Sequence, residues 1–185
     1  TDKEIFLREL VANACDAISK VKMLRDRNEV EAADDSLKID ITFDAEKKEL
    51  RIVDTGIGMT AEEVKEYIAQ VAFSSAEAFV EKYEGEGEII GHFGLGFYSA
   101  FMVSERVDID TLSYKEGAEA AFWSCDGSPE YTLKKGKRSE RGTEITLHLS
   151  DDEFIDEVRL KQILDRHCRF LSYPITFNGK RINEK

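Results

Sequence analysis

Cysteine, positive charge and long apolar runs are all scarce in this chain, and each shortage excludes a class of protein. Cys15, Cys125 and Cys168 cannot all pair and are too widely spaced for a zinc ligand set, so we expect reduced thiols in a cytoplasmic protein. The chain has 26 Lys and Arg against 38 Asp and Glu, and its formal charge of -12 argues against nonspecific binding to nucleic acid or to an anionic membrane. We find no apolar run long enough to span a membrane and no leader of signal-peptide type.

The chain is long enough to bury one sizeable core. Its 185 residues are 42% apolar and nothing in them indicates a second domain, so residues 1–185 are expected to form one domain. Thr1 and Glu4 have capping-box spacing, which predicts a helix that begins with the first residues. Such an abrupt start indicates that the natural chain has upstream elements.

The remaining chain predicts strands and helices without a regular βαβ repeat. Apolar and polar residues alternate over 37–43 and 49–53, which predicts a hairpin joined by residues 44–48. Further strands are expected at 106–112, 118–124, 131–134 and 143–149, a last edge strand at 175–177, and helices at 60–83, 97–103 and 154–171, the first capped by Thr60. This order predicts a two-layer α/β sandwich, in which helices cover one face of a mixed, mostly antiparallel sheet.

Four polar residues share one face of the first predicted helix: Glu9, Asn13, Asp16 and Lys20. Their spacing of four, three and four residues places them in one stripe at roughly 100° per residue. A solvated, salt-bridged helix face would show the same pattern. Asn13 favours a functional face instead, because a mid-helix Asn has poor helix propensity and indicates a partner such as a metal or a ligand.

The turn after the second predicted strand reads Asp54-Thr55-Gly56-Ile57-Gly58-Met59. Its glycines permit unusual backbone angles and let a flat ligand approach, while Asp54 can accept a hydrogen bond from an exocyclic amino group such as that of adenine. An ordinary strand-to-helix turn, with Asp54 capping backbone amides, explains the same residues. Ile57 and Met59 could line an apolar slot or belong to the core.

A second glycine cluster precedes the predicted helix at 97–103. It consists of Gly91, His92, Phe93, Gly94, Leu95, Gly96 and Phe97. Unpaired amides at a helix N-terminus attract phosphate, which would give this acidic chain a local anion site. The spacing matches neither a Walker A loop nor a Rossmann fingerprint.

In order along the chain, Glu9-x3-Asn13-x2-Asp16-Ala17, Asp54-x-Gly-x-Gly58, the loop ending in Gly94-x-Gly96, and Gly142-Thr143 resemble the Bergerat ATP-binding fold. Gyrase, chaperone, histidine kinase and mismatch-repair proteins share that fold. Residues 4–10, 91–99 and 141–149 resemble the N-terminal domain of the heat shock protein 90 chaperone family. Residues 90–103 and 123–129 are most similar to its bacterial branch.

The resemblance implies a role for each matching residue. Glu9 would activate the water that attacks the γ-phosphate, Asn13 would bind Mg²⁺, and Asp54 would receive the adenine amino group with support from Thr143 through water. Residues 94–97 would offer amides to the phosphates. The implied nucleotide-binding set is Asn13, Asp16, Ala17, Lys20, Asp54, Gly58, Met59, Gly91, His92, Phe93, Gly94, Leu95, Gly96, Phe97 and Thr143. The implied ligands are ATP, ADP and Mg²⁺.

Residues 60–88 correspond to the family's mobile lid, with Gly85 and Gly87 as hinges. Many members carry Lys-Ser-Gly-Thr where this chain reads residues 73–76 as Phe-Ser-Ser-Ala, and Tyr67 stands where many place a ribose-contacting Asn. The family's upstream exchanging strand and its middle domain are absent. The resemblance therefore implies a largely monomeric fragment that binds ADP and ATP and hydrolyses ATP slowly.

The family resemblance implies that the full-length protein is a homodimer, which acts on unfolded client proteins together with co-chaperones. Two alternatives stay open. Another Bergerat-fold ATPase would share the helix stripe and the Asp54 turn, and a nucleotide-sensing module would bind without hydrolysis.

Overall fold

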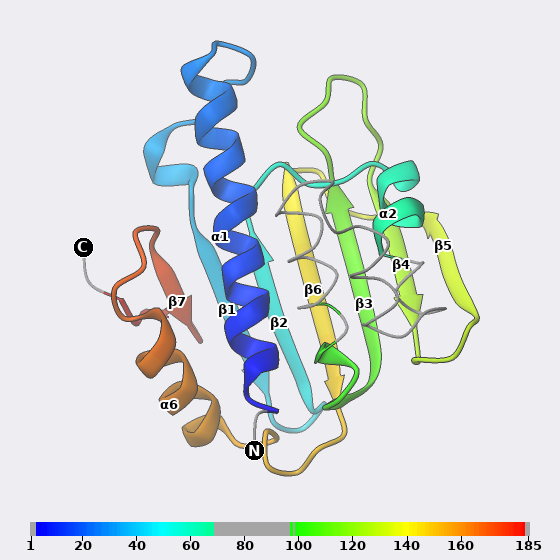
Figure 1. The fold of residues 1–185 in the computed structure, drawn as a ribbon, viewed down its shortest axis with the longest axis vertical. Coiled ribbons are helices and arrows are strands. Elements are labelled where there is room, and N and C mark those ends of the chain that lie inside the picture. Colours follow the sequence, from blue (N-terminus) through cyan, green and yellow to red (C-terminus); the bar gives the residue numbers. More distant parts are fainter. Residues whose placement is uncertain (1–2, 69–96, 98, 184–185) are drawn as a thin grey trace, which may run out of the picture.

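Alternating apolar residues give each strand one face for the core. The computed structural model describes residues 3–68, 97 and 99–183. The strands in these ranges are β1 (Ile39–Asp44), β2 (Glu49–Asp54), β3 (Ser104–Leu112), β4 (Ala121–Cys125), β5 (Tyr131–Lys135), β6 (Gly142–Leu149), β7 (Ile175–Phe177) and β8 (Lys180–Arg181). They form one sheet in the order β5-β4-β3-β6-β2-β1-β7-β8 (Figure 1). Only β1 and β7 run parallel among these paired strands, so the predicted mixed, mostly antiparallel sheet is confirmed.

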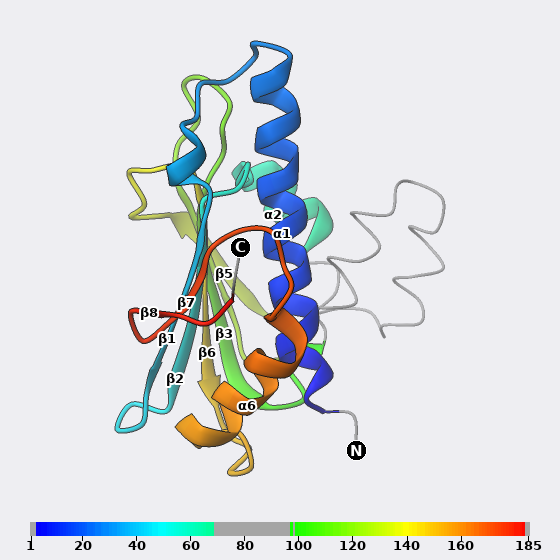
Figure 2. The ribbon, with the colours of Figure 1, turned by 90° about the vertical axis from the view of Figure 1, so that its left-hand side faces the viewer.

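Three described helices lie on one face of this sheet: α1 (Ile5–Asp26), α2 (Ala61–Tyr67) and α6 (Glu157–Cys168). Figure 2 shows the sheet edge-on with these helices on the same side, which confirms the predicted two-layer sandwich. A 3-10 turn, η1 (Asp34–Ser36), connects α1 to β1. In the part of the chain that the structure describes, no helix combines the length and the apolar character needed to cross a bilayer.

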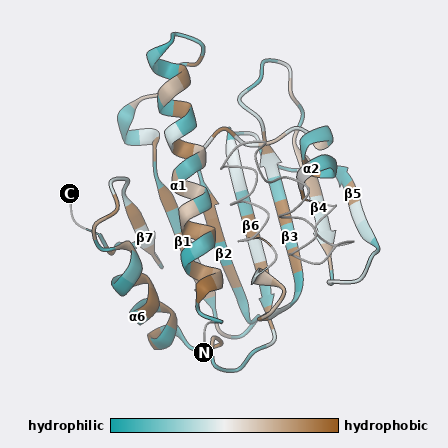
Figure 3. Ribbon diagram, in the orientation of Figure 1, coloured by the Kyte–Doolittle hydropathy of each residue, from teal (hydrophilic) through white to brown (hydrophobic). Residues whose placement is uncertain are grey.

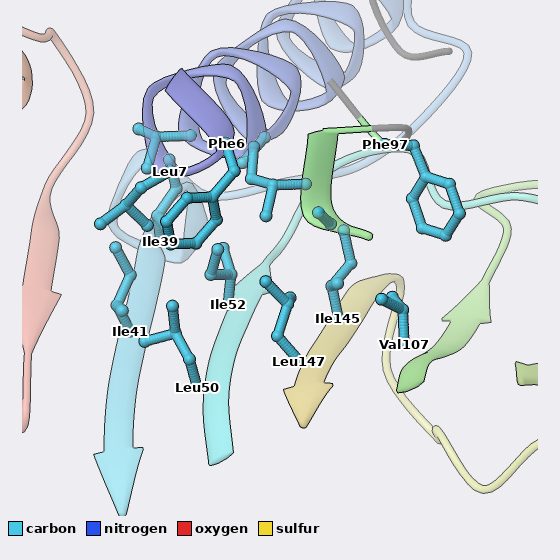
Figure 4. Packing of buried hydrophobic residues seen from close by; sticks show 14 of the residues in the cluster. Phe6, Leu7, Ile39, Ile41, Leu50, Ile52, Phe97, Val107, Ile145 and Leu147 are labelled. Carbon is cyan, nitrogen blue, oxygen red and sulfur yellow. The ribbon is translucent and has the colours of Figure 1, made fainter. Parts of the chain in front are cut away.

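The core lies between the sheet and α1 (Figure 4). Ile52 of β2 pairs in register with Ile145 of β6, and Ile145 pairs with Ile109 of β3, so one apolar row crosses the sheet. Phe6 and Leu7 of α1 are fully buried above the sheet. Burial of each such side chain contributes roughly 1.5–3 kcal/mol. The brown, hydrophobic segments of these strands and helices in Figure 3 follow the same arrangement.

The first helix begins later than the capping-box spacing predicted. Its N-cap is Glu4, which makes no side-chain capping bond. The Glu4 carboxylate instead bonds Arg159 and Arg166, on α6, at 2.8 and 2.9 Å. The carboxylate is therefore used to hold the two helices together. The capping box at Thr60 is confirmed, since Thr60 and Glu63 bond each other's backbone amides.

Other elements differ from the prediction as well, such as the strand predicted at 118–124, which is Ala121–Cys125. The strand Ile175–Phe177 is not an edge, because β8 pairs with it on the side away from β1. Residues 101–103 form turns rather than helix, so the predicted helix at 97–103 is shorter. The closing helix begins at Glu157, where the Asp156 carboxylate accepts the Arg159 amide, and Phe154 packs into the core before it.

Candidate functional site

Polar side chains take core-facing positions at one end of three neighbouring strands. Asp54 of β2 pairs in register with Thr143 of β6, which pairs in turn with Thr111 of β3. The next core-facing row toward the middle of the sheet is apolar and consists of Ile52, Ile145 and Ile109. All three polar residues are buried, with exposed fractions of 5%, 5% and 0%. Buried polar groups persist where they are hydrogen-bonded or serve a ligand, so this row marks a candidate site.

A cavity of about 280 Å³ lies between this end of the sheet, α1 and the turn after β2. Its described lining residues are Leu10, Asn13, Ala14, Ala17, Lys20, Ile52, Asp54, Ile57, Gly58, Met59, Glu63, Thr143 and Ile145. The walls are mainly apolar and a few polar groups converge on the space. This combination is typical of pockets for small organic ligands.

The cavity brings together most of the predicted residues on α1. Asn13, Ala17 and Lys20 line it, whereas Glu9 and Asp16 are half-buried on the flank of the same stripe and are absent from the described lining. Within the described residues Glu9 pairs with Arg8, whose Nη2 lies 3.7 Å from Glu9 Oε1. The helix stripe is therefore split between the cavity and its rim.

Asn13 is 5% exposed, and its side-chain nitrogen has no hydrogen-bond partner among the described residues. An unpaired buried amide costs free energy, so it indicates a group that completes it. A side-chain amide carries a donor and an acceptor, so Asn13 can both donate to and accept from a group in the cavity that it lines.

The Asp54 carboxylate accepts a hydrogen bond from the Gly56 amide at 2.8 Å. The capping interpretation of this turn is therefore correct for one carboxylate oxygen, while the residue also lines the cavity. Burial raises the pKa of Asp54 from 3.8 to about 7, although the Gly56 amide and the charges of Arg138 and Arg141 act in the opposite direction. A buried carboxyl with a raised pKa is typical of functional sites.

The glycines at this end of the sheet have a packing role that the sequence did not reveal. Gly58 has φ +65, and a Cβ there would overlap the carbonyl oxygen of Leu112 on β3. A Cβ on Gly142, which has φ +131, would overlap the Asp54 carbonyl. Ile57 donates its amide to the Ala17 carbonyl on α1 at 3.2 Å. The turn is thus pressed between helix and sheet, and its glycines allow those backbones to meet.

Thr111 was not predicted to belong to the site. Its hydroxyl accepts the Met59 amide at 2.9 Å and lies 2.8 Å from the Thr143 hydroxyl. The signal was available, because Thr111 is a polar residue in a strand position that alternation assigns to the core. Thr111 lies behind the described lining, whereas the lining residues that the sequence analysis did not place in the site are Leu10, Ala14, Ile52, Glu63 and Ile145.

The remaining predicted residues fall outside the cavity or outside the described ranges. Phe97 is fully buried and its ring packs edge-on against Trp123 and Phe101, at centroid distances of 5.2 and 5.5 Å. Gly91, His92, Phe93, Gly94, Leu95 and Gly96 lie outside the described residues, as do the lid positions from 69 to 88. Cys15 and Cys168 are free, and burial raises the pKa of their thiols to about 11 and about 12, so both stay neutral.

An α/β sandwich with an apolar cavity, a buried carboxyl and an unpaired amide defines a small-molecule-binding domain. The chain belongs to the family of histidine kinase-, DNA gyrase B-, and HSP90-like ATPases, whose model matches residues 2–159. The chain is 49% identical to chaperone protein HtpG of Porphyromonas gingivalis and 50% identical to that of Bacteroides fragilis, each over 184 residues that cover 98% of the chain and 27% of the relative. HtpG of Nitratidesulfovibrio vulgaris is 41% identical over 196 residues, which cover 99% of the chain and 31% of that protein. The expected resemblance to the bacterial branch, high-temperature protein G, is confirmed, and the chain spans less than a third of these relatives.

Proposed function

We propose that this chain is the ATP-binding domain of an ATP-dependent chaperone that assists the folding of client proteins. The observation that carries the proposal is the buried Asp54 carboxyl at the end of an apolar cavity, in register with Thr143. An apolar slot with one convergent acceptor suits a flat base with an exocyclic amino group. The family match and the chaperone relatives support ATP as the ligand.

In this proposal the adenine lies between Met59 and the sheet. Asp54 accepts its amino group directly, and Thr143 supports that bond through water. Gly58 holds the turn against β3, so the base meets a rigid wall. Lys20, on the cavity face of α1, offsets phosphate charge.

The phosphates require groups beyond the described cavity. We assign the phosphate contacts to the backbone amides of residues 94–97. The oxygen of Asn13 fits Mg²⁺, because this ion takes one or two protein oxygens and completes its shell with phosphates and water. No cluster of three or more His, Cys, Asp or Glu side chains suited to a metal occurs in the described part, and such binding needs none. Bound Mg²⁺ would offset the charge that develops on the phosphate oxygens.

Glu9 is the proposed general base. It lies one helical turn before Asn13, so a water beside the terminal phosphate would lie within reach of its carboxylate. To accept a proton from this water, the Glu9 carboxylate must leave its ion pair with Arg8, in which Arg8 Nη2 lies 3.7 Å from Glu9 Oε1. We expect slow hydrolysis by this chain alone.

A nucleotide-sensing module without hydrolysis is the second candidate. The position of Glu9 favours it, because Glu9 faces Arg8 and is absent from the described cavity lining. Turnover by the full-length protein, compared with its Glu9→Ala variant, separates the two. Loss of turnover with retained ADP affinity supports the ATPase. Equal turnover in both proteins excludes Glu9 as the base.

Calorimetric titration with ADP, with and without Mg²⁺, tests the binding site. We expect binding in the micromolar range and an affinity about tenfold to a hundredfold lower for Asp54→Asn, which loses a hydrogen bond to a charged acceptor. No binding by the folded, unmutated domain contradicts the proposal.

We further propose that the full-length protein is a cytoplasmic homodimer that binds unfolded clients and co-chaperones, and that this chain alone is monomeric. We propose no nucleic-acid or membrane partner, because the formal charge of -12 disfavours binding to these anionic surfaces. Light scattering of the 185-residue chain tests its oligomeric state.

A further inference from the structure

The Thr111 hydroxyl contacts three polar groups while it is completely buried. The Met59 amide donates to it at 2.9 Å, the Gly142 carbonyl lies 3.2 Å away, and the Thr143 hydroxyl lies 2.8 Å away. These partners come from the turn after β2 and from β6. Thr111 therefore connects two separate walls of the cavity.

Proton counting gives the direction of each bond. A hydroxyl carries one proton and two lone pairs. The Met59 amide can only donate and the Gly142 carbonyl can only accept, so the Thr111 proton goes to Gly142. All three contacts are hydrogen bonds only if the Thr143 hydroxyl donates to Thr111. The proton of Thr143 is then turned away from the cavity, and its lone pairs are left to face it.

We infer that Thr111 is a positioning residue that holds Thr143 as a hydrogen-bond acceptor and thereby sets base selectivity. The water that joins Thr143 to the base in the proposed function would then donate its two protons to Thr143 and to the Asp54 carboxylate, and would offer the base only a lone pair. With Asp54 accepting as well, the end of the cavity matches a purine with an amino group at C6 and rejects one with an oxo group there, since acceptors would face each other. The inference rests on the proposed nucleotide-binding function and adds the residue that orients its specificity.

The test compares ADP with inosine diphosphate, which differs from ADP in its base, where an oxo group replaces the C6 amino group. Calorimetry at about pH 8 keeps Asp54 mainly ionised, since its pKa is about 7. In Thr111→Val the Thr143 proton is free to turn into the cavity. We expect the affinity ratio of ADP to inosine diphosphate to fall by about three- to tenfold, because a hydrogen bond of this kind is lost for one ligand and gained for the other.

Thr111→Ser keeps the hydroxyl and is expected to keep the ratio. Thr146→Val is the matched control, because Thr146 is a buried threonine of β6 that lies on the opposite face of the sheet. A purely structural role for Thr111 would weaken both ligands equally and leave the ratio unchanged. That result overturns the inference. The inference is also overturned if the affinity ratio of ADP to inosine diphosphate falls as much in Thr111→Ser as in Thr111→Val.

A double-mutant cycle gives an independent check. In a Thr143→Val background, Thr111→Val should no longer change the ratio, because its effect acts through the Thr143 hydroxyl. A full additional effect in that background overturns the inference. If Thr111→Val does not fold, Thr111→Cys replaces it, since a thiol is a weak donor and acceptor. Failure of the unmutated chain to bind ADP is a distinct outcome, which removes the proposed function itself.

Discussion

Asp54 is a carboxylic acid in a strand position that alternation assigns to the core, and burial raises its pKa to about 7. Its environment combines the backbone amides of Gly56 and Thr143 with an apolar cavity. The carboxyl is therefore poised between its protonated and ionised forms near neutral pH. A ligand that donates a hydrogen bond to it favours the ionised form.

Adenosine affinity is expected to depend on pH because of Asp54. Below pH 7 the free carboxyl is protonated, so binding of the amino group must release a proton. Affinity should fall about tenfold between pH 8 and pH 6. Adenosine is the suitable probe since it carries no phosphate to titrate, and calorimetry measures its affinity. Asp54→Asn should show no such slope, and a slope that persists in this variant assigns the titration elsewhere.

The same raised pKa affects the stability of the ligand-free domain. The folded state holds the Asp54 proton more tightly than the unfolded chain, so its contribution is complete below pH 3.8 and is lost as the pH rises through about 7. Other groups titrate as well, so the comparison is between the chain and Asp54→Asn. Their difference in unfolding free energy should change in this window and not above it.

Gly58→Ala should destabilise the domain by about 3 kcal/mol or more. The left-handed backbone costs roughly 1–2 kcal/mol for a residue with a Cβ, and the overlap with the Leu112 carbonyl adds to it. Gly117→Ala is the matched control, because Gly117 has φ +78 with open space around it. It should cost only about 1 kcal/mol in urea denaturation. Equal costs at both glycines would contradict the close approach of the turn to β3.

At the scale of elements, the N-terminal end of α1 is joined by charge to the first and last turns of α6. The Glu4 carboxylate bonds Arg159 at 2.8 Å and Arg166 at 2.9 Å, and His167 lies 3.6 Å away. Burial raises the pKa of Glu4, but its bonds to Arg159 and the charge of Arg166 outweigh this and lower the pKa overall. One carboxylate thus holds the start of the helix that carries Asn13.

Glu4→Gln is expected to lower the unfolding free energy by about 1 kcal/mol at pH 7, a modest value because the cluster is partly exposed. A lowered carboxyl pKa stabilises the fold above the unfolded-state pKa of 4.5 and loses this effect as the pH falls below it. The difference between the two proteins should therefore shrink as the pH falls below 4.5. Asp165→Asn, in the exposed pair with Lys161, is the control and should cost at most about 0.5 kcal/mol. A difference that is constant with pH would contradict an ionic role for Glu4.

At the scale of the whole molecule, the cavity lies between the two layers of a single core. A ligand bound there contacts α1, the turn after β2 and the sheet, so it opposes global unfolding. ADP at about 100 times its Kd should raise the unfolding free energy by about 2.7 kcal/mol, which corresponds to a Tm increase of about 5–10 °C. Differential scanning fluorimetry measures the shift. At the same ADP concentration the increase should fall to about half or less in Asp54→Asn, and an equal increase there would place ADP at another site.

The sandwich and its hairpin were predictable because their signals are local. The alternation of β1 and β2 and the capping box at Thr60 are written within a few neighbouring residues. Asn13, Lys20, Asp54, Met59 and Thr143 were singled out by motif and resemblance, and the structure brings all five to one cavity. The prediction was wrong for the first helix start and for the edge strand at 175–177, because Arg159, Arg166 and β8 act on these segments through tertiary contacts.

The sequence by itself determined the class of the fold, the family and most of the cavity residues, since periodicity and turn chemistry act over short distances. Only the tertiary structure decided the raised pKa of Asp54, the reason for Gly58 and the bonds of Thr111. Each of these depends on strands β2, β3 and β6 lying side by side. Residues 54, 111 and 143 are far apart along the chain, and strand register alone makes them neighbours.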